Sequence, residues 1–441
     1  MSRRSRRRTP PVPFETRIEN LSHEGRGICH HNGKTVFVFN ALPGELVEVQ
    51  IDRNRQQLAE GHALRIIEPS DMRIEPHCPH FSVCGGCSLQ QLGSDDQLEF
   101  KRQSLAERMD HAGIEIGRWM EPLRSQPWGY RRKARLGVKH VRKKGRVLVG
   151  FRERSSPFLA DMKHCPVLDP RVGTRLEELS ELIGSLEASD RIAQIEVACD
   201  DEHCALAFRH LDPLSAADRQ RLLDFGRDSG LWIQLQPAGP DSIEPLYPER
   251  QELYFRPLAD EDLRIGFRVS DFTQVNADLN QRMVAQALER LELQPQHRVL
   301  DLFCGLGNFT LPLARRVASV IGVEGDAAMV ERARDSARAL GVENTEYHDA
   351  DLTSVDGSEP WLKDGYDRIL LDPPRSGAQE VIPRLLKIGA GIIVYVSCQP
   401  ASLVRDARLL VEGGYRLDAL GIMDMFPQTA HVESMAVFRK D

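Results

Sequence analysis

The sequence predicts an α/β protein whose C-terminal part forms a doubly wound parallel sheet. From Asp271 onward, short apolar runs alternate with segments of helix length, and this alternation is typical of consecutive βαβ units. A glycine-containing turn follows the first of these runs, where such sheets bind their ligands. The chain has 441 residues, so two or three domains are expected.

The overall composition is that of an ordinary soluble globular protein. Hydrophobic residues make up 41% of the chain and charged residues 28%, with 58 Lys and Arg against 65 Asp and Glu. The longest apolar stretch, near Gly391, is far shorter than the roughly 20 residues of a membrane helix. No apolar segment follows the arginine-rich N-terminus, so a signal peptide is not expected. We therefore expect a cytoplasmic protein without a membrane partner.

Charge is distributed unevenly along the chain. Residues 124–154, the basic arm, hold twelve Lys and Arg but only one acid, Glu153. Residues 171–265 hold ten Arg and twenty Asp and Glu. The net charge of −7 therefore hides a local surface that could bind nucleic acid. A solvated face is the alternative interpretation of such a run.

The N-terminal region reads as a basic tail followed by a small β unit. Residues 1–11 resemble a disordered tail, and residues 12–70 contain two β-rich runs, 35–39 and 45–51. The segment 41–44 (ALPG) between them is a turn signal. This unit resembles a TRAM domain, an OB-like barrel, and the resemblance implies RNA binding.

Cysteines indicate a metal site in the following region. The chain has nine cysteines, and an odd number without a signal peptide favours metal binding or catalysis over disulfides. The proposed ligands are Cys78, Cys84, Cys87 and Cys165. Four thiolates suit either zinc or an iron–sulfur cluster. The remaining unassigned cysteines before the C-terminal part, interpreted as ordinary buried thiols, are Cys29, Cys199 and Cys204.

The first strand of the C-terminal part ends in a ligand-binding turn. Residues 299–303 lead into Gly305-Leu-Gly307, which lets a ligand approach the backbone. Thr310 stands where a dinucleotide fingerprint requires glycine, which disfavours NAD. Glu324 ends the next strand, where an acid can bind ribose hydroxyls.

These features resemble the Class I S-adenosylmethionine-dependent methyltransferase fold. The resemblance implies that Phe303 and Asn308 line the glycine loop and that Asp351, after the third strand, lies near the adenine. Plain core packing is the alternative for Phe303, and a surface position is the alternative for Glu324.

A carboxylate and a thiol close the next two strands. Asp372 follows the fourth strand and Cys398 follows the fifth. Both positions belong to the edge that binds ligands in doubly wound sheets, although a buried structural cysteine is the alternative. A thiolate beside a methyl donor suggests covalent activation of an unreactive carbon, such as C5 of uracil. Glu433, which opens the final strand, is the candidate base for removing the C5 proton.

Five motifs together resemble the RNA uracil-5-methyltransferase family. They are FTQVN (272–276), DLFCGLGNFT (301–310), LDPPR (371–375), VSCQP (396–400) and HVESMAVF (431–438). The resemblance is to the 23S ribosomal RNA branch, and it implies S-adenosylmethionine and a [4Fe–4S] cluster on the four cysteines. It also implies that Cys398 is the nucleophile, that Glu433 is the base, and that Gln274 and Asp372 contact the methyl donor or the target base. Thr273 and Cys304 depart from the usual pattern without removing a proposed catalytic atom.

The basic arm interleaves aromatic residues with cations, which suits unpaired RNA bases and phosphates. Residues 143–145 (KKG) predict a hairpin turn within it. The predicted RNA contacts are Tyr130, Arg131, Arg132, Lys133, Arg135, Lys143 and Lys144. Chemistry on a uracil ring requires the base to leave its stack, so we expect a flipped uridine in a single-stranded loop.

The expected organisation is a tail (1–11), a TRAM-like barrel (12–70), a central α+β domain with the four-cysteine loop and basic arm (71–265), and a methyltransferase domain (266–441). We expect a monomer in which the cluster has a structural role. The alternatives are a tRNA uridine C5-methyltransferase, an RNA cytosine-5-methyltransferase, and a non-catalytic RNA-binding assembly factor with a structural metal.

Overall fold

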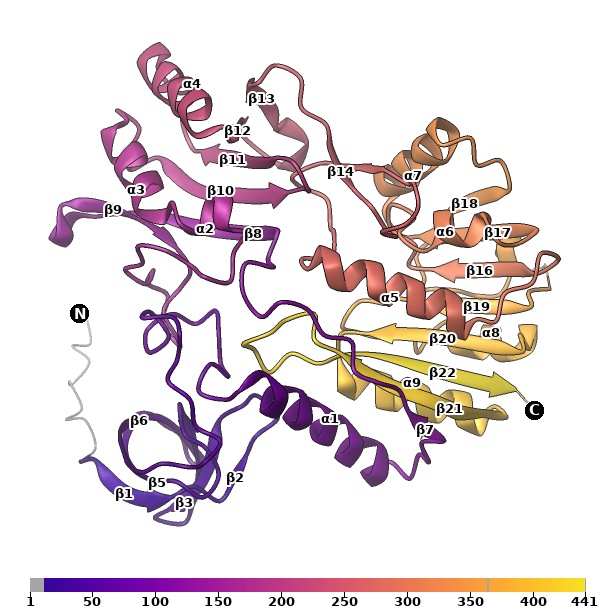
Figure 1. The fold of residues 1–441 in the computed structure, drawn as a ribbon, viewed down its shortest axis with the longest axis horizontal. Helices are drawn as coiled ribbons and strands as arrows, with labels where there is room; N and C mark the ends of the chain where they lie inside the picture. Colours follow the sequence, from indigo (N-terminus) through magenta and orange to yellow (C-terminus); the bar gives the residue numbers. More distant parts are fainter. Residues whose placement is uncertain (1–11, 363–364, 441) are drawn as a thin grey trace, which may run out of the picture.

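The computed structural model describes residues 12–362 and 365–440, so the predicted tail (1–11) lies outside the described residues. Figure 1 shows an N-terminal group of strands at the lower left, a central group at the upper left and a C-terminal group on the right. Within the described ranges, no helix is both long and apolar enough to cross a membrane.

The N-terminal group is a six-stranded sheet with the order β1-β5-β6-β4-β3-β2. Its strands are β1 (Phe14–Arg17), β2 (Asn20–Leu21), β3 (Gly27–His31), β4 (Lys34–Phe39), β5 (Leu46–Asn54) and β6 (Leu58–Glu68). Alternate residues of β4 and β5, including Val36, Val38 and Val49, enter one apolar core. The two predicted strands are confirmed, and Gly44 in the turn between them takes a φ of +83°.

The central group is a second six-stranded sheet, with the order β13-β12-β11-β10-β8-β9. Its strands are β8 (Lys133–Val141), β9 (Arg146–Gly150), β10 (Ile192–Cys199), β11 (Cys204–His210), β12 (Trp232–Gln236) and β13 (Glu244–Tyr247). Its helices are α2 (Pro170–Gly173), α3 (Leu176–Ser185) and α4 (Ala216–Ser229), with 3-10 turns at Arg142–Lys144 and Pro240–Ser242. The predicted hairpin turn is confirmed, because β8 and β9 pair around Gly145.

The C-terminal group is an eight-stranded sheet with the order β18-β17-β16-β19-β20-β22-β21-β7. Its strands are β7 (Arg118–Trp119), β16 (Arg298–Leu302), β17 (Ser319–Glu324), β18 (Thr345–Asp349), β19 (Arg368–Leu371), β20 (Ile392–Ser397), β21 (Tyr415–Met423) and β22 (Glu433–Lys440). The remaining elements are α1 (Ser94–His111), α5 (Ala277–Arg290), α6 (Thr310–Ala314), α7 (Ala327–Ala339), α8 (Ile382–Ile388), α9 (Pro400–Glu412), a 3-10 turn (Pro360–Leu362) and the ribbon β14 (Leu253–Phe255) with β15 (Ile265–Phe267). The strands from β18 to β20 are parallel and β22 is antiparallel, so the doubly wound prediction is confirmed.

Both faces of this sheet are buried, because alternate strand residues enter different cores. Ile393 and Tyr395 of β20 pack with α1, α8 and α9, whereas Val394 and Val396 pack with α5. Central parallel strands of this kind therefore read as continuous apolar runs, which is why the sequence revealed them.

Helix α1 packs against the C-terminal sheet and β7 is one of its strands. The prediction had placed both elements in one central domain, residues 71–265. Leu105 and Met109 of α1 share a core with Tyr395, and β7 pairs with β21. The helical period of α1 identifies its buried face, but it carries no information about which sheet covers that face.

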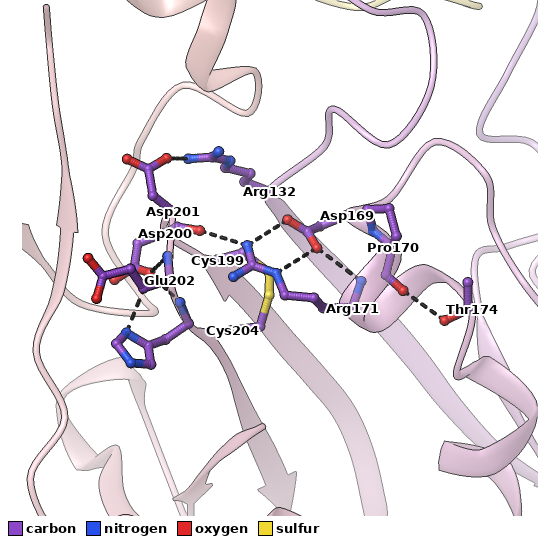
Figure 2. The surroundings of a disulfide bond; sticks show 11 residues. Arg132, Asp169, Pro170, Arg171, Thr174, Cys199, Asp200, Asp201, Glu202 and Cys204 are labelled. Carbon is purple, nitrogen blue, oxygen red and sulfur yellow. Dashed lines mark hydrogen bonds and ion pairs between the residues drawn. A yellow bond between two sulfur atoms is a disulfide. The ribbon is translucent and has the colours of Figure 1, made fainter. Parts of the chain in front are cut away.

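Cys199 and Cys204 are joined in a disulfide, so the prediction that they are free thiols was wrong (Figure 2). The hairpin of β10 and β11 places the two residues directly opposite each other. Asp169 lies beside both sulfur atoms, but its carboxylate accepts hydrogen bonds from Arg171. With both sulfur atoms in the disulfide, this group is not available for a metal.

Candidate active site

The predicted catalytic residues meet at one edge of the C-terminal sheet. Ser397 of β20 pairs with Ser434 of β22; Cys398 directly follows the first and Glu433 directly precedes the second, and their side chains are electrostatic neighbours. Asp372 follows β19, the neighbour of β20, and its amide donates to the carbonyl of Leu302 over 3.3 Å. The carboxyl ends of parallel strands share an edge, and this geometry unites residues distant in sequence.

The glycine loop after β16 has a tightly constrained backbone. Phe303 takes a φ of +63° and Gly307 a φ of +94°. Only glycine adopts such values without strain, so Phe303 is held by its surroundings, as is common at functional sites. Glu324 closes the loop, because its carboxylate accepts from the amides of Gly305 (3.1 Å) and Gly325 (2.8 Å).

The other predicted donor-binding residues lie at the same edge. The side-chain amides of Asn308 and Asn280 of α5 exchange two hydrogen bonds of 2.9 Å. Gln274 lies just before α5, and Asp351 follows β18 with its carboxylate held by Thr353. The fold thus brings five of the six predicted residues, from four separate segments, to one edge, and the Asn280–Asn308 contact places the N-terminal turn of α5, which Gln274 precedes, beside the glycine loop.

Asn276 has a role that the sequence motif did not reveal. Its side-chain oxygen accepts from the amide of Leu279, which caps the N-terminus of α5. Its side-chain nitrogen donates to Ser125 Oγ over 2.6 Å. Asn276 therefore ties the FTQVN segment to the beginning of the basic arm. An asparagine placed directly before a segment with helical spacing is an N-cap signal, and this signal could have identified the capping role.

Burial makes the two acids at this edge hard to ionise. It raises the pKa of Glu433 to about 8, with a further rise from Asp372, whereas Arg375 and Lys101 lower it. Burial also raises the pKa of Asp372 to about 7, with Glu324 adding to the rise. Each carboxyl can therefore exchange a proton near neutral pH, which is what a general base requires.

The Cys398 thiol is held mainly in its protonated form. Burial raises its pKa to about 11, and the nearby carboxyls of Glu433 and Asp372 add to the rise, whereas Arg375 lowers it. Since the thiolate is the nucleophile, Cys398 needs either a nearby base or a protonated Glu433 to become reactive.

A cavity of about 1030 Å³ opens over Cys398 and lies between all three groups of strands. Cys398 and His431 line one side of it. Gly86 and Ser88 line another, and they belong to the cysteine-rich loop, residues 76–93. Six arginines contribute to its wall: Arg26, Arg53, Arg108, Arg152, Arg154 and Arg375. Arg152 and Arg154 belong to the basic arm and Arg375 to the LDPPR motif, but none of the six was among the predicted RNA contacts. Arg26, Arg53 and Arg108 come from separate segments, so they form no run in the sequence.

The predicted RNA contacts of the basic arm fit the structure poorly. Tyr130 is buried and its hydroxyl donates to the carbonyl of Pro427, so the prediction that its ring stacks on bases was wrong. The Lys133 ammonium is also buried. Arg132, Arg135 and Lys144 form ion pairs with Asp201, Glu196 and Asp161. Lys143 is exposed in the hairpin turn, and the amide of Arg131 donates to Val167.

The four predicted ligand cysteines form one cluster of free thiols. Burial raises the pKa of Cys87 to about 12, and its electrostatic neighbours include Cys165, Cys84 and Cys78. The Arg154 guanidinium lies against the loop and donates to the carbonyls of Phe81, Cys84 and Cys87. Its other face packs on the ring of Phe39 in β4. His80 and His164 contact each other beside the cluster.

Comparison with known proteins identifies the family. The family model for tRNA (Uracil-5-)-methyltransferase matches residues 253–350 and 362–441, and that of the TRAM domain matches residues 14–64. The 23S rRNA (uracil(1939)-C(5))-methyltransferase RlmD of Alkalilimnicola ehrlichii is 55% identical over 99% of both chains. The protein of the same name from Alcanivorax borkumensis is 48% identical over 99% of both chains. The chain belongs to the RNA uracil-5-methyltransferase family.

A solved structure supports the fold of this uracil-5-methyltransferase. The tRNA (uracil-54, C5)-methyltransferase of Pyrococcus abyssi, in complex with S-adenosyl-L-homocysteine, has a TM-score of 0.74 and 23% identity. The match covers 96% of this chain and 100% of that one. At 23% identity the comparison shows that the two proteins share a fold. Together with the TRAM match, it confirms the predicted fold class, a methyltransferase sheet with an N-terminal TRAM barrel.

The four thiols of this uracil-5-methyltransferase have the chemistry of a metal site. They are free, lie in one another's electrostatic environment and are largely shielded from solvent. Such a set of four sulfur donors can hold a zinc ion or an iron–sulfur cluster.

Proposed function

We propose that this protein is an S-adenosylmethionine-dependent methyltransferase that forms 5-methyluridine at a specific uridine of 23S ribosomal RNA. The observation that carries the proposal is that Cys398 and Glu433 flank the paired residues Ser397 and Ser434, and that the Glu433 carboxyl acts on the Cys398 thiol. The full-length similarity to proteins named 23S rRNA (uracil(1939)-C(5))-methyltransferase supports the choice of substrate.

The proposed reaction uses these two residues in sequence. The Cys398 thiolate adds to C6 of the uracil ring, and the electron pair of the C5–C6 double bond moves to form an enolate. C5 then attacks the methyl group of S-adenosylmethionine, and S-adenosylhomocysteine leaves. The Glu433 carboxylate removes the remaining C5 proton, the double bond re-forms, and the Cys398 thiolate is expelled.

The remaining groups have binding and structural roles in this proposal. Glu324 and the glycine loop hold the methyl donor together with the rest of its set, Gln274, Phe303, Asn308, Asp351 and Asp372. A single-stranded RNA loop enters the arginine-lined cavity and presents a flipped uridine to Cys398. Cys78, Cys84, Cys87 and Cys165 hold a [4Fe–4S] cluster with a structural role. We further propose a cytoplasmic monomer with the domain division 12–70, 71–265 and 266–441, modified by the attachment of α1 and β7 to the last part.

A 23S RNA fragment containing 5-fluorouridine tests the proposed chemistry. The fluorine at C5 cannot be removed as a proton, so the wild-type enzyme should remain covalently attached to the methylated RNA. Glu433→Gln should also form this adduct, whereas Cys398→Ala should not. Lack of an adduct with wild-type enzyme would favour a non-catalytic RNA-binding protein, and adduct formation by Cys398→Ala would overturn the nucleophile.

The second candidate is a tRNA uridine C5-methyltransferase, which is favoured by the family model and by the fold of the Pyrococcus abyssi enzyme. Methylation of 23S fragments and of tRNA transcripts should be compared at equal concentration. We expect methylated uridine in the ribosomal fragment alone, and mass mapping of RNA from cells with and without the gene would locate it.

A further inference from the structure

The segment that leads into the candidate base is a loop of unusual burial. Residues 424–432, the base-bearing loop, connect β21 to β22 and end immediately before Glu433. Four residues of this loop, Thr429 to Val432, line the cavity over Cys398. The position of the Glu433 carboxylate therefore depends on what holds this loop in place.

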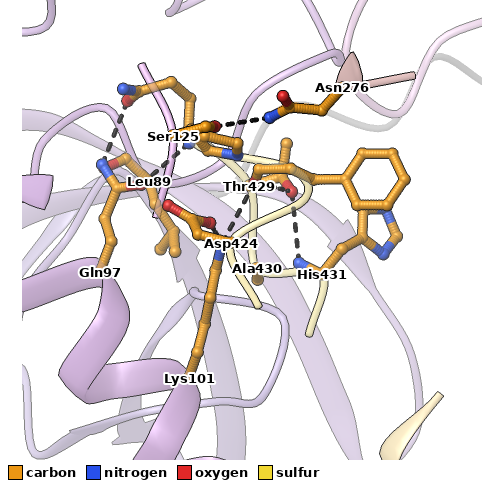
Figure 3. Close-up of polar contacts among 12 residues, drawn as sticks. Leu89, Gln97, Lys101, Ser125, Asn276, Asp424, Thr429, Ala430 and His431 are labelled. Atoms are coloured by element: carbon orange, nitrogen blue, oxygen red, sulfur yellow. Dashed lines mark hydrogen bonds and ion pairs between the residues drawn. The ribbon is translucent and has the colours of Figure 1, made fainter. Parts of the chain in front are cut away.

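Helix α1 holds the beginning of the loop through a buried ion pair (Figure 3). The Lys101 ammonium donates to Asp424 Oδ1 over 2.6 Å and to the carbonyl of Phe426 over 3.1 Å. The two side chains are only 1% and 7% exposed. A lysine this deeply buried is rare, and its ammonium has two partners in the base-bearing loop.

Helix α1 also holds the middle of the loop, through an exchange of amide hydrogen bonds. The Gln97 side-chain nitrogen donates to Gln428 Oε1 over 3.1 Å, and the Gln97 side-chain oxygen accepts from the backbone N–H of Gln428 over 2.9 Å. It also donates to the carbonyls of Leu89 and Leu92, in the chain between Cys87 and α1. Both ends of this amide are thus satisfied inside the protein.

The cysteine-rich loop completes the clamp. The amides of Ser88 and Leu89 both donate to the carbonyl of Gln428, over 2.9 and 3.0 Å. The amide of Ala430 donates to Ser88 Oγ over 3.0 Å. Ser88 directly follows Cys87, so the base-bearing loop is hydrogen-bonded to the residue beside a candidate cluster ligand.

A buried ion pair of this kind is poor evidence for stabilisation alone. Removing two charges from water costs several kcal/mol, and apolar replacements are often neutral or stabilising. The Lys101 ammonium is one of two cations that favour the ionised form of Glu433, the other being Arg375. Asp372 and Cys398 face the same carboxyl and oppose its ionisation. A functional role explains why a cation is kept here.

We propose that Lys101 is a positioning residue for the candidate base: it anchors the base-bearing loop through Asp424 and supplies a buried positive charge close to Glu433. The four-cysteine loop shares this task through Ser88, so its structural role extends to the step in which the C5 proton is removed. This inference rests on the proposed function, because it concerns the residue assigned as base.

The paired variant Lys101→Met/Asp424→Asn tests the proposal without leaving an unpaired buried charge. Adduct formation with 5-fluorouridine RNA does not need the base, so its rate should stay within about threefold of wild type. Turnover with uridine RNA should fall by roughly tenfold to a hundredfold, because proton removal becomes limiting. The covalent intermediate should then accumulate on normal RNA.

The pH profile of turnover separates charge from position. The paired variant loses both charges, and Lys101 is the member of the pair that favours ionisation of Glu433. The Glu433 carboxyl should therefore ionise at higher pH, and the ascending limb of the profile should move upward by up to about one pH unit. Gln428→Ala loosens the loop but keeps Lys101, and it should reduce turnover without moving this limb. It also serves as the second variant if the paired one does not fold.

Arg102→Met is the matched control, since Arg102 lies next to Lys101 in α1 but forms an exposed pair with Glu99. Its turnover and pH profile should match wild type. Equal losses of adduct formation and turnover in both loop variants would overturn the proposal, as would unchanged turnover. A wild-type enzyme that forms no 5-fluorouridine adduct would instead overturn the proposed function.

Discussion

Three buried carboxyl groups distinguish the active-site edge at the scale of single residues. Burial raises the pKa of Asp301 to about 7, and Thr310 Oγ1 donates to its Oδ2 over 2.5 Å. Asp372 and Glu433 lie at the same edge with similarly raised pKa values. Ionising such a buried carboxyl lowers the stability of the folded state. Carboxyls with raised pKa values are common at sites where a carboxyl must exchange protons.

Glu433→Gln should make the folded protein more stable at high pH, because it removes a buried carboxylate. The pKa of Glu433 rises from 4.5 to about 8 on folding, so the wild-type protein binds this proton more tightly when folded. The stability from this proton is present below pH 4.5 and is lost as the pH rises through 8. The uncharged glutamine avoids the loss and should raise the free energy of unfolding by on the order of 2 kcal/mol at pH 9.

Urea unfolding of the variant and the wild type at pH 5 and pH 9 measures this difference. The exposed Glu107→Gln is the control, and its effect should be the same at both pH values. An equal effect of Glu433→Gln at both pH values would contradict the raised pKa.

The cysteine-rich loop connects the groups of strands through its contacts. Its carbonyls are held by Arg154, whose guanidinium also packs on Phe39 of the N-terminal sheet. The amide of Gly85 donates to the carbonyl of Arg152, so the loop contacts the central group as well. A cluster on the four cysteines would therefore stabilise the contact of all three parts.

Cys84→Ser should lower the iron content and the thermal stability of the purified protein together. A structural cluster contributes to folding, because its ligands are brought together only in the folded chain. Iron and acid-labile sulfide should be measured beside the unfolding temperature and RNA affinity. Cys29→Ser, which removes another buried free thiol, should leave the iron content unchanged. A Cys84→Ser protein with normal solubility, RNA affinity and turnover would exclude a structural role.

The cavity that we propose as the RNA site is formed by surfaces that are distant in sequence. The cavity over Cys398 receives Arg26 and Arg53 from the N-terminal sheet, Arg108 from α1, and Arg152 from the chain after β9. Three cations that were predicted to contact RNA, Arg132, Arg135 and Lys144, are instead paired with acids of the central part. The run of charge in the sequence therefore does not by itself show which cations are free to bind phosphates.

Arg108→Ala and Arg135→Ala distinguish these two surfaces. If RNA phosphates bind in the cavity, Arg108→Ala should lower the slope of log affinity against log salt concentration by about one. Arg135→Ala should leave the slope unchanged, since Arg135 is paired with Glu196 on the central sheet. Filter binding of an RNA fragment between low and moderate salt measures both slopes, and the reverse result would place the RNA along the basic arm.

The C-terminal fold and the catalytic edge could be predicted because their signals are local. Buried parallel strands are apolar runs, and each run ends at the residue that faces the ligand. Asp372, Cys398 and Glu433 were therefore found from their places at strand ends, and Glu324 was found in the same way. The sequence also predicted a metal site, from three cysteines around a Gly-Gly turn and a fourth, Cys165, far along the chain.

The remaining features depend on contacts between distant segments, which only the tertiary structure decides. The helical pattern of α1 does not show that it packs on β21 and α9, and nothing local to Lys101 indicates Asp424 as its partner. The pairing of Cys199 with Cys204 follows from strand register, and the burial of Tyr130 follows from its contact with Pro427. By itself the sequence determined which chemistry the chain carries, since that depends on residue types at strand ends. Tertiary structure decided which charges remain free for RNA, because pairing and burial arise only when separate segments meet.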